Sequence, residues 1–176
     1  MNLKPVFATA SLTAALLVLG SAHAVAPASQ KVEMMNAKGE QIGTITLTQK
    51  DVKTVKLAID ASGLAPGPHG IHFHENGKCE TPDFKSAGSH YGSQGKEHGL
   101  KNAKGPHAGD LPNLEVAKDG TVKTEFTTER VSLAADAPNS VKKTGGTSIV
   151  IHEKADDQHT SPAGDSGARI ACGVIK

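Results

Sequence analysis

The chain has 176 residues, of which 37% are hydrophobic and 21% charged, and its aromatic residues are four Phe and one Tyr. This composition argues against a disordered chain and against a protein with several membrane spans, and the length predicts one domain with an aliphatic core. The formal net charge is +1, so a global basic surface for nucleic acid or anionic lipid is not expected.

The first 24 residues have the features of a secretory signal peptide. Lys4 precedes an apolar run, Val6 to Gly20, that is short for a membrane span, and Ala22-His23-Ala24 forms an A-x-A cleavage site. An uncleaved anchor is the alternative. Cleavage after Ala24 leaves a mature domain, residues 25–176, without a membrane anchor and with 18 basic (Lys and Arg) and 18 acidic residues.

The mature chain predicts an all-β domain. Short segments rich in β-branched residues, some with alternating apolar and polar side chains, predict strands, and no segment shows a long 3.6-residue apolar period. These strands are expected at residues 32–35, 41–48, 52–59, 114–117, 121–127, 147–152 and 170–175. With a further strand around residues 72–74, about eight strands favour an antiparallel sandwich or barrel.

The stretch from Glu75 to Leu111 is rich in Gly, Lys, Ser and His and has little strand pattern. Loops of this length are usually functional or disordered. Two cysteines, Cys79 and Cys172, remain in the exported chain, where an oxidising compartment allows a disulfide. Two free or metal-bound thiols are the alternative.

Three of the eight mature histidines lie in the segment GPHGIHFH, at His69, His72 and His74. Residues two apart on a strand point to the same face, so His72 and His74 place two imidazoles side by side, about 7 Å apart at the backbone. This spacing suits a shared metal ion. A histidine-rich strand end without a ligand is the alternative.

Four more candidates, His90, His98, His107 and Asp110, form the pattern H-x7-H-x8-H-x2-D in the long loop. Three imidazoles and one carboxylate are a complete tetrahedral set for a structural zinc ion, although a solvated loop would give the same spacing. His152 ends a predicted strand and is the last candidate. A disulfide would also bring Arg169, three residues before Cys172, towards the His72 and His74 pair.

Several segments together resemble one family. GPHGIHFH, SAGSH, GPHAGDLPN, IVIHEKADD and GARIACGVI occur in the order typical of copper/zinc superoxide dismutases, across nearly the whole mature chain. The resemblance implies an eight-stranded antiparallel Greek-key barrel or sandwich with long metal-binding and active-site loops. The signal peptide, a longer Cys79 to His90 segment and a less acidic Glu153 to Ala168 segment make it similar to the bacterial periplasmic branch.

The resemblance also implies a role for individual residues. One copper ion per chain is expected on His72, His74, His90 and His152, and one Zn²⁺ on His90, His98, His107 and Asp110, so that His90 bridges both metals. Asp156 is expected to link His72 to His98, and Arg169 to guide the superoxide anion. His90 and Arg169 are the residues expected to act in catalysis. His69 is expected to be a packed histidine and His159 a solvated one, while Asp165 stands where the family usually has Asn.

The implied reaction converts superoxide to dioxygen and hydrogen peroxide by alternate reduction and oxidation of copper. The alternative is a periplasmic copper- or zinc-binding module for storage or delivery, without turnover. Such a module usually needs an exchangeable site with soft Cys or Met ligands, whereas a cation such as Arg169 beside copper suits an enzyme for an anionic substrate. Lys96, Lys101 and Lys104 are candidate steering residues, with a solvated surface as the alternative. The resemblance leaves open whether the chain is a monomer or a homodimer.

Overall fold

The computed structural model describes residues 28–176, so the predicted signal peptide, residues 1–24, lies outside the described residues. The described chain is all-β, as the sequence predicts, with one short 3-10 turn, η1 (Lys85–Ala87). The strands are β1 (Ser29–Asn36), β2 (Gln41–Gln49), β3 (Val55–Ala61), β4 (Gly67–His69), β5 (Ile71–His74), β6 (Leu114–Val116), β7 (Val122–Thr128), β8 (Thr147–His152) and β9 (Arg169–Ile175). Among these residues no helix is long and apolar enough to cross a membrane.

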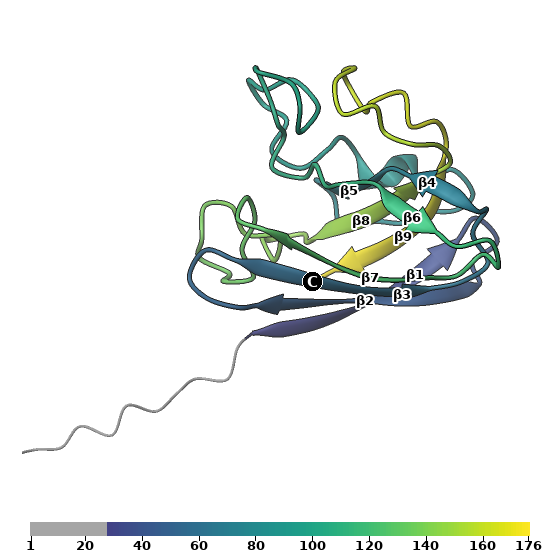
Figure 1. The fold of residues 1–176 in the computed structure, drawn as a ribbon. Helices are drawn as coiled ribbons and strands as arrows, with labels where there is room; N and C mark the ends of the chain where they lie inside the picture. Colours follow the sequence, from purple (N-terminus) through teal and green to yellow (C-terminus); the bar gives the residue numbers. More distant parts are fainter. Residues whose placement is uncertain (1–27) are drawn as a thin grey trace, which may run out of the picture.

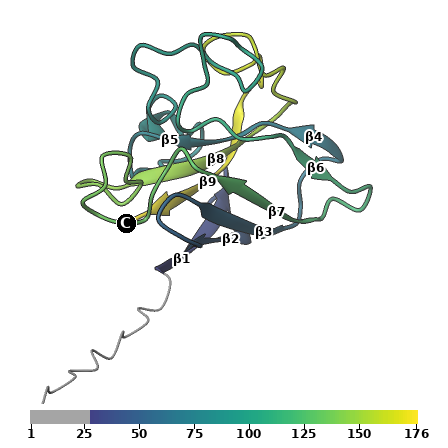
Figure 2. The same cartoon turned by 60° about the vertical axis from the view of Figure 1, so that its left-hand side comes forward.

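Seven strands form one antiparallel sheet in the order β5-β8-β9-β1-β2-β3-β7, which curls over the core (Figures 1 and 2). The pairs β3 with β7, β5 with β8 and β1 with β9 join strands distant in sequence, a Greek-key arrangement. The small sheet β4-β6 connects the two edges, because β4 leads into β5 and β6 leads into β7. The predicted fold class is therefore confirmed, and β5 corresponds to the strand expected around residues 72–74, whereas β4 is an additional strand.

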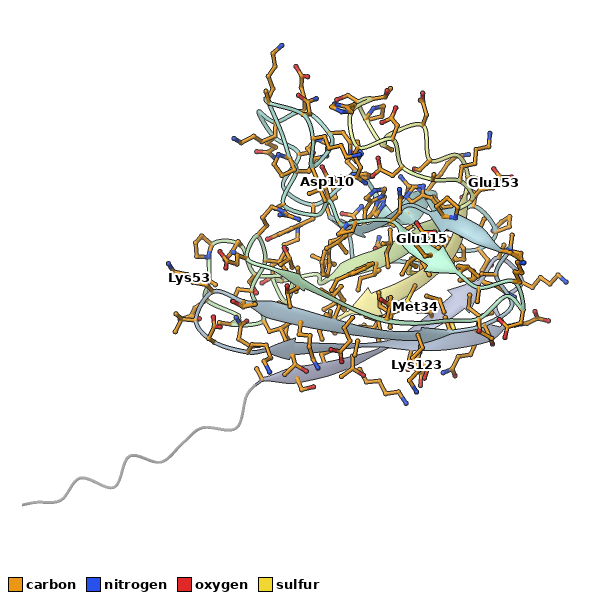
Figure 3. The ribbon with its side chains drawn as sticks, in the orientation of Figure 1. Met34, Lys53, Asp110, Glu115, Lys123 and Glu153 are labelled. Carbon is orange, nitrogen blue, oxygen red and sulfur yellow. A yellow bond between two sulfur atoms is a disulfide. The ribbon has the colours of Figure 1, made fainter. Side chains whose placement is uncertain are left out.

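Alternating side chains explain why these segments are strands. In β3, Val55, Leu57 and Ile59 are buried and the residues between them face outwards or are half-buried. Ile45 and Leu47 of β2 are buried in the same way opposite their β3 partners. The core is mainly aliphatic, as predicted from the composition, with the buried side chain of Met34 inside the sheet (Figure 3).

Two local features differ from the sequence prediction. β3 begins at Val55 rather than Val52, because the carboxylate of Asp51 accepts hydrogen bonds from the amides of Lys53 and Thr54 and closes a turn. The strand β4, which the sequence did not predict, is separated from β5 at Gly70, whose amide donates to the carbonyl of Lys154 and whose carbonyl accepts from the amide of His152. This interruption attaches the segment after β8 to the start of β5.

Two long connections, residues 75–113 and 153–168, stand on the same side of the sheet, above β5 and β8 (Figures 1 and 2). Hydrogen bonds join them to each other, including one from the amide of Lys101 to the carbonyl of Gln158. Asp110 lies at the base of the first connection, where it meets the sheet (Figure 3). The candidate residues for metal binding therefore gather at one edge of the sheet.

Candidate metal centre

Main-chain pairing brings the metal-site candidates of the long loop to β5. The amide of Phe73 donates to the carbonyl of Gly109 at 2.9 Å, and the carbonyl of Phe73 accepts from the amide of Tyr91 at 2.8 Å. Residue 109 must be glycine, because a Cβ there would lie 2.3 Å from the carbonyl oxygen of Phe73. As a result, His90 is bridged to His74 and Asp110 to His72.

A first group of donors consists of four buried histidines whose donor atoms lie within 4.8 Å of one another: His72, His74, His90 and His152. Four ring nitrogens are buried without a hydrogen-bond partner, namely His72 Nδ1, His74 Nε2, His90 Nε2 and His152 Nε2. Buried polar atoms are almost always partnered, so four unpartnered nitrogens at one place indicate a missing ligand. Imidazole suits copper and zinc, and the set fits either ion.

A second group is centred on the carboxylate of Asp110. Its Oδ1 lies 2.9 Å from His90 Nδ1, 3.1 Å from His98 Nδ1 and 3.3 Å from His107 Nδ1. Ligands of a tetrahedral zinc ion with bonds of about 2.0–2.1 Å are separated by about 3.3 Å, so these distances fit a zinc ion between the four groups. His98 Nδ1 and His107 Nδ1 are both buried without a hydrogen-bond partner.

A metal-binding set with His72 in place of His107 is also possible by distance. The donor atoms of His72, His90, His98 and Asp110 all lie within 4.8 Å of one another. We favour His107. The Nε2 of His72 is bound to Asp156 at 2.8 Å, which leaves His72 only its Nδ1, already part of the first group. His90 alone offers a different ring nitrogen to each group.

The buried carboxylate of Asp156 connects the two groups. Its Oδ2 lies 2.8 Å from His72 Nε2, and its Oδ1 lies 2.9 Å from His98 Nε2. Gly164 leaves room for this carboxylate, because a Cβ at residue 164 would lie 1.8 Å from Asp156 Oδ1. The side-chain amide of Asn113 holds the main chain of Asp156 through two hydrogen bonds of 2.9 Å.

The two groups of histidines differ in charge. Burial lowers the pKa of His90 to about 4 and that of His152 to about 3, so both imidazoles are neutral at pH 7. Burial also lowers the pKa of His98, but its close contacts with the carboxylates of Asp110 and Asp156 outweigh it and raise this pKa to about 9. Burial would raise the pKa values of Asp110 and Asp156, yet their bonds to histidines hold both well below the usual range. Neutral imidazoles and ionised carboxylates are the forms that bind metals.

Arg169 lies beside the first group. Its guanidinium donates to the carbonyls of Phe84 at 2.8 Å and Gly88 at 2.7 Å, and the Gly88 carbonyl also faces His74 Nδ1 at 2.9 Å. Arg169, His90 and His152 line an open cavity of about 460 Å³. The guanidinium therefore faces the space that leads to the first group of histidines.

Comparison with known proteins decides between the families that such a site could belong to. The family model described as copper/zinc superoxide dismutase matches residues 41–175. The chain belongs to the copper/zinc superoxide dismutase family. Membership of this family implies copper and zinc as its metals and superoxide as the substrate of an oxidoreductase.

Members of this family align with most of the chain. It is 45% identical over 145 residues to "Superoxide dismutase [Cu-Zn] 1" of Aquifex aeolicus, which is 82% of this chain and 85% of that protein. The crystal structure of a SOD-like protein from Bacillus subtilis superposes with a TM-score of 0.80 at 40% identity, over 83% of this chain and 97% of that one. The Cu/Zn superoxide dismutase from Brucella abortus superposes with a TM-score of 0.68 at 28% identity, over 85% of this chain and all of that one.

The structure also locates other residues whose roles were predicted from the sequence. The predicted disulfide between Cys79 and Cys172 is confirmed, with a Cα–Cα distance of 5.6 Å. His69 is buried, and its two ring nitrogens face the carbonyls of His152 and Ala65, whereas His159 is exposed. Asp165 has a φ of 51°, in the left-handed region that Asn and Asp tolerate better than most residues.

Of the three lysines proposed from sequence, only Lys96 is among the residues that line the cavity. Lys104 is instead paired with Glu97 at 3.1 Å. No separate role is predicted for Asn113 from the sequence, although it lies in the segment GPHAGDLPN, because its contact with Asp156 spans 43 residues. An amide that binds a distant main chain has no signature in the sequence.

Proposed function

We propose that the chain dismutes superoxide at a copper ion bound by His72, His74, His90 and His152, next to a structural zinc ion bound by His90, His98, His107 and Asp110. The observation that carries this proposal is the convergence of buried, unpartnered ring nitrogens on two adjacent places that share the His90 ring. Copper supplies the redox chemistry, because histidine ligation permits both of its oxidation states, whereas zinc has none.

His90 is suited to hold a proton for the product. Its Nε2 belongs to the first group, its Nδ1 faces Asp110 of the second, and the residue lines the open cavity. When its Nε2 carries a proton, that proton lies beside the cavity. Two superoxide anions and two protons give one dioxygen and one hydrogen peroxide, so a proton donor at the cavity serves the second half of the reaction.

Arg169 is suited to bind the anion. Two main-chain carbonyls fix its guanidinium at the cavity, where a small anion approaching His152 meets a positive charge. We propose that Lys96 adds a second positive charge at this entrance. Its main-chain carbonyl faces His107 Nε2 at 3.2 Å, so the proposed zinc site holds the backbone from which the lysine extends.

A storage or delivery module is the second candidate, and the two cysteines and Met34 do not support it. Cys79 and Cys172 are consumed by the disulfide, and the side chain of Met34 is buried in the core. Soft sulfur ligands for Cu⁺ are therefore not offered by these three residues, and the first group contains only imidazoles. The position of Arg169 supports turnover of an anion.

We further propose that residues 1–24 are a signal peptide cleaved after Ala24 and that the mature protein, residues 25–176, acts in the periplasm. The A-x-A pattern supports the cleavage point, and the disulfide is consistent with an oxidising compartment. The intact mass of the exported protein tests this. A mass that includes Met1 would contradict both the signal peptide and the export.

Metal analysis combined with a dismutase assay tests the proposed function. The mature protein is expected to hold one copper and one zinc per chain and to be active. His90→Ala is expected to disturb both metals, whereas Asp110→Ala is expected to release zinc and retain copper. Loss of zinc alone in His90→Ala would contradict the shared ligand, and a fully loaded but inactive wild-type protein would support the storage module.

A further inference from the structure

Arg130 contacts a proposed zinc ligand from outside the recognised sequence segments. It lies just after β7, at the start of the connection 129–146 that leads to β8. Its half-buried guanidinium donates from Nη2 to the main-chain carbonyl of Asp110 at 2.5 Å. Its Nε is buried and has no hydrogen-bond partner among the described residues.

The other polar groups of Asp110 are held from within the long loop. The carboxylate Oδ2 accepts hydrogen bonds of 2.9 Å from the amides of Gly99 and His107. The Oδ1 faces the three imidazoles of the second group. The two amides fix only the position of Oδ2. The direction in which Oδ1 points therefore also depends on where the main chain of Asp110 is held.

The connection that carries Arg130 is itself tied to the sheet. The amide of Arg130 donates to the hydroxyl of Thr128 in β7, and the amide of Leu133 donates to the side-chain oxygen of Gln49 at the end of β2. Arg130 therefore adds a second attachment of the Asp110 main chain to the sheet, besides the pairing of Gly109 with Phe73 in β5. The amides of Gly99 and His107, in contrast, belong to the loop.

A guanidinium in this position has an energetic cost. Burial of a charged group is unfavourable, and leaving its Nε unpartnered adds to that cost, so an apolar side chain of similar size would be expected if packing were the only requirement. Burial lowers the pKa of Arg130 and the nearby charge of Asp110 opposes this shift. Among residues 28–176, the charged group that opposes the effect of burial on Arg130 is thus a proposed metal ligand.

We propose that Arg130 is a positioning residue for the zinc site. By holding the carbonyl of Asp110, it directs the carboxylate Oδ1 towards His90, His98 and His107 before the metal binds. This inference rests on the proposed assignment of these four residues as zinc ligands. Groups that orient a metal ligand typically change the affinity for the metal by 10–100-fold.

The test measures zinc binding to the mature protein by competition with a chelator. Arg130→Met removes the donor at similar volume and is expected to weaken zinc binding about 10–100-fold. Arg130→Lys keeps a charged donor and is expected to bind zinc with intermediate affinity. Lys142→Met removes a positive charge from the same connection without touching Asp110 and is expected to bind zinc as the wild type does. Far-ultraviolet circular dichroism establishes that each metal-free variant is folded.

Two further measurements report position directly. Cobalt(II) in the zinc site is expected to show altered visible absorption in Arg130→Met, because the ligand geometry changes. In the metal-free protein, the amides of Gly99 and His107 are expected to exchange with solvent faster in Arg130→Met, while the buried strand amide of Ile45 is unchanged. A structural role without positioning would leave the cobalt spectrum and these two amides as in the wild type.

Asp110→Ala separates this inference from the function on which it rests. If Asp110→Ala keeps zinc, the proposed zinc site is wrong. If Asp110→Ala loses zinc while Arg130→Met binds zinc and cobalt as the wild type does, the site stands and the inference is overturned. Equal losses of affinity in Lys142→Met and Arg130→Met would also overturn it, because the effect would then follow from charge in the connection.

Discussion

At the scale of single residues, most imidazoles of the centre use one ring nitrogen for the protein and leave the other for a metal. Asp156 holds one nitrogen of both His72 and His98, and the Gly88 carbonyl holds one of His74. Each acceptor fixes which nitrogen is free, since a neutral imidazole donates from one side only. His90 differs, because its second nitrogen faces a proposed zinc ligand rather than a group outside both sets.

The pKa values of the metal-free protein predict that its affinities for zinc and for copper depend differently on pH. His98 has a pKa of about 9, so below that pH zinc must displace its proton, and zinc affinity should rise by up to about tenfold per pH unit between pH 6 and 8. His90 and His152, with pKa values of about 4 and 3, are already neutral there, so the affinity for copper alone should change far less. Competition titrations with each metal alone check this, and a zinc affinity that does not vary with pH would contradict it.

Arg169→Ile is predicted to lower dismutase activity by about an order of magnitude and to flatten its dependence on salt. Residues 25–176, the proposed mature chain, have no net charge to attract the anion, so attraction depends on local charges within a Debye length of about 8 Å at physiological ionic strength. Both metals should stay bound, because Arg169 donates only to main-chain carbonyls in the described structure. Activity measured against ionic strength tests this.

Arg169→Lys and Lys96→Met serve as matched variants. The first keeps the charge and should keep a salt dependence, whereas the second removes an exposed charge at the same cavity and should reduce activity less than Arg169→Ile. Lys104→Met, which removes a lysine paired with Glu97 away from the cavity, should behave as the wild type. Full activity with an unchanged salt profile in Arg169→Ile would contradict the proposed role of Arg169 in guiding the anion.

At the scale of secondary structure, alternation predicted the strands that carry the core, such as β2 and β7, but not every boundary. β3 begins three residues later than predicted because a side-chain turn at Asp51 competes with the strand. The break at Gly70 depends on hydrogen bonds to Lys154 and His152, far along the chain. The spacing of the histidines alone did not identify the metal ligands. They were predicted from the segments that resemble the family. The contact from Arg130 to a carbonyl could not be predicted, since a carbonyl is common to every residue.

Close main-chain pairing at Gly109 gives a prediction at this scale. Gly109→Ala would place a Cβ 2.3 Å from the Phe73 carbonyl, so β5 and the loop must separate and the bridge between His72 and Asp110 is disturbed. Stability should fall by about 1–3 kcal/mol, and zinc should be lost more readily. Gly43→Ala is the matched control, since its Cβ would lie 2.4 Å from the Asp60 carbonyl, between β2 and β3. It should lose stability and keep its metals, measured by thermal unfolding and metal content.

At the scale of the whole molecule, the disulfide joins the loop after β5 to the last strand. The two cysteines are 93 residues apart in sequence. In the chain-entropy model, a disulfide that closes a loop of this length stabilises the fold by roughly 4–5 kcal/mol at most. Cys79→Ser should therefore lower the melting temperature by about 10 °C. It should also reduce activity, because Phe84 and Gly88, which hold Arg169, lie in the segment that the disulfide closes. A melting temperature equal to that of the wild type would contradict this.

The pairing of Phe73 with Gly109 and Tyr91 also determines which parts of the long loop can change in sequence during evolution without moving the ligands. His90 and Asp110 are each placed by β5 beside them, so the number of residues between these two ligands is not a constraint on where they lie. Gly95, for example, is exposed and a Cβ there would meet no atom within 4 Å, so residues added next to it would extend only the rim of the cavity. Selection can therefore lengthen or recharge that rim, and so alter what enters, while the ligands beneath stay where they are.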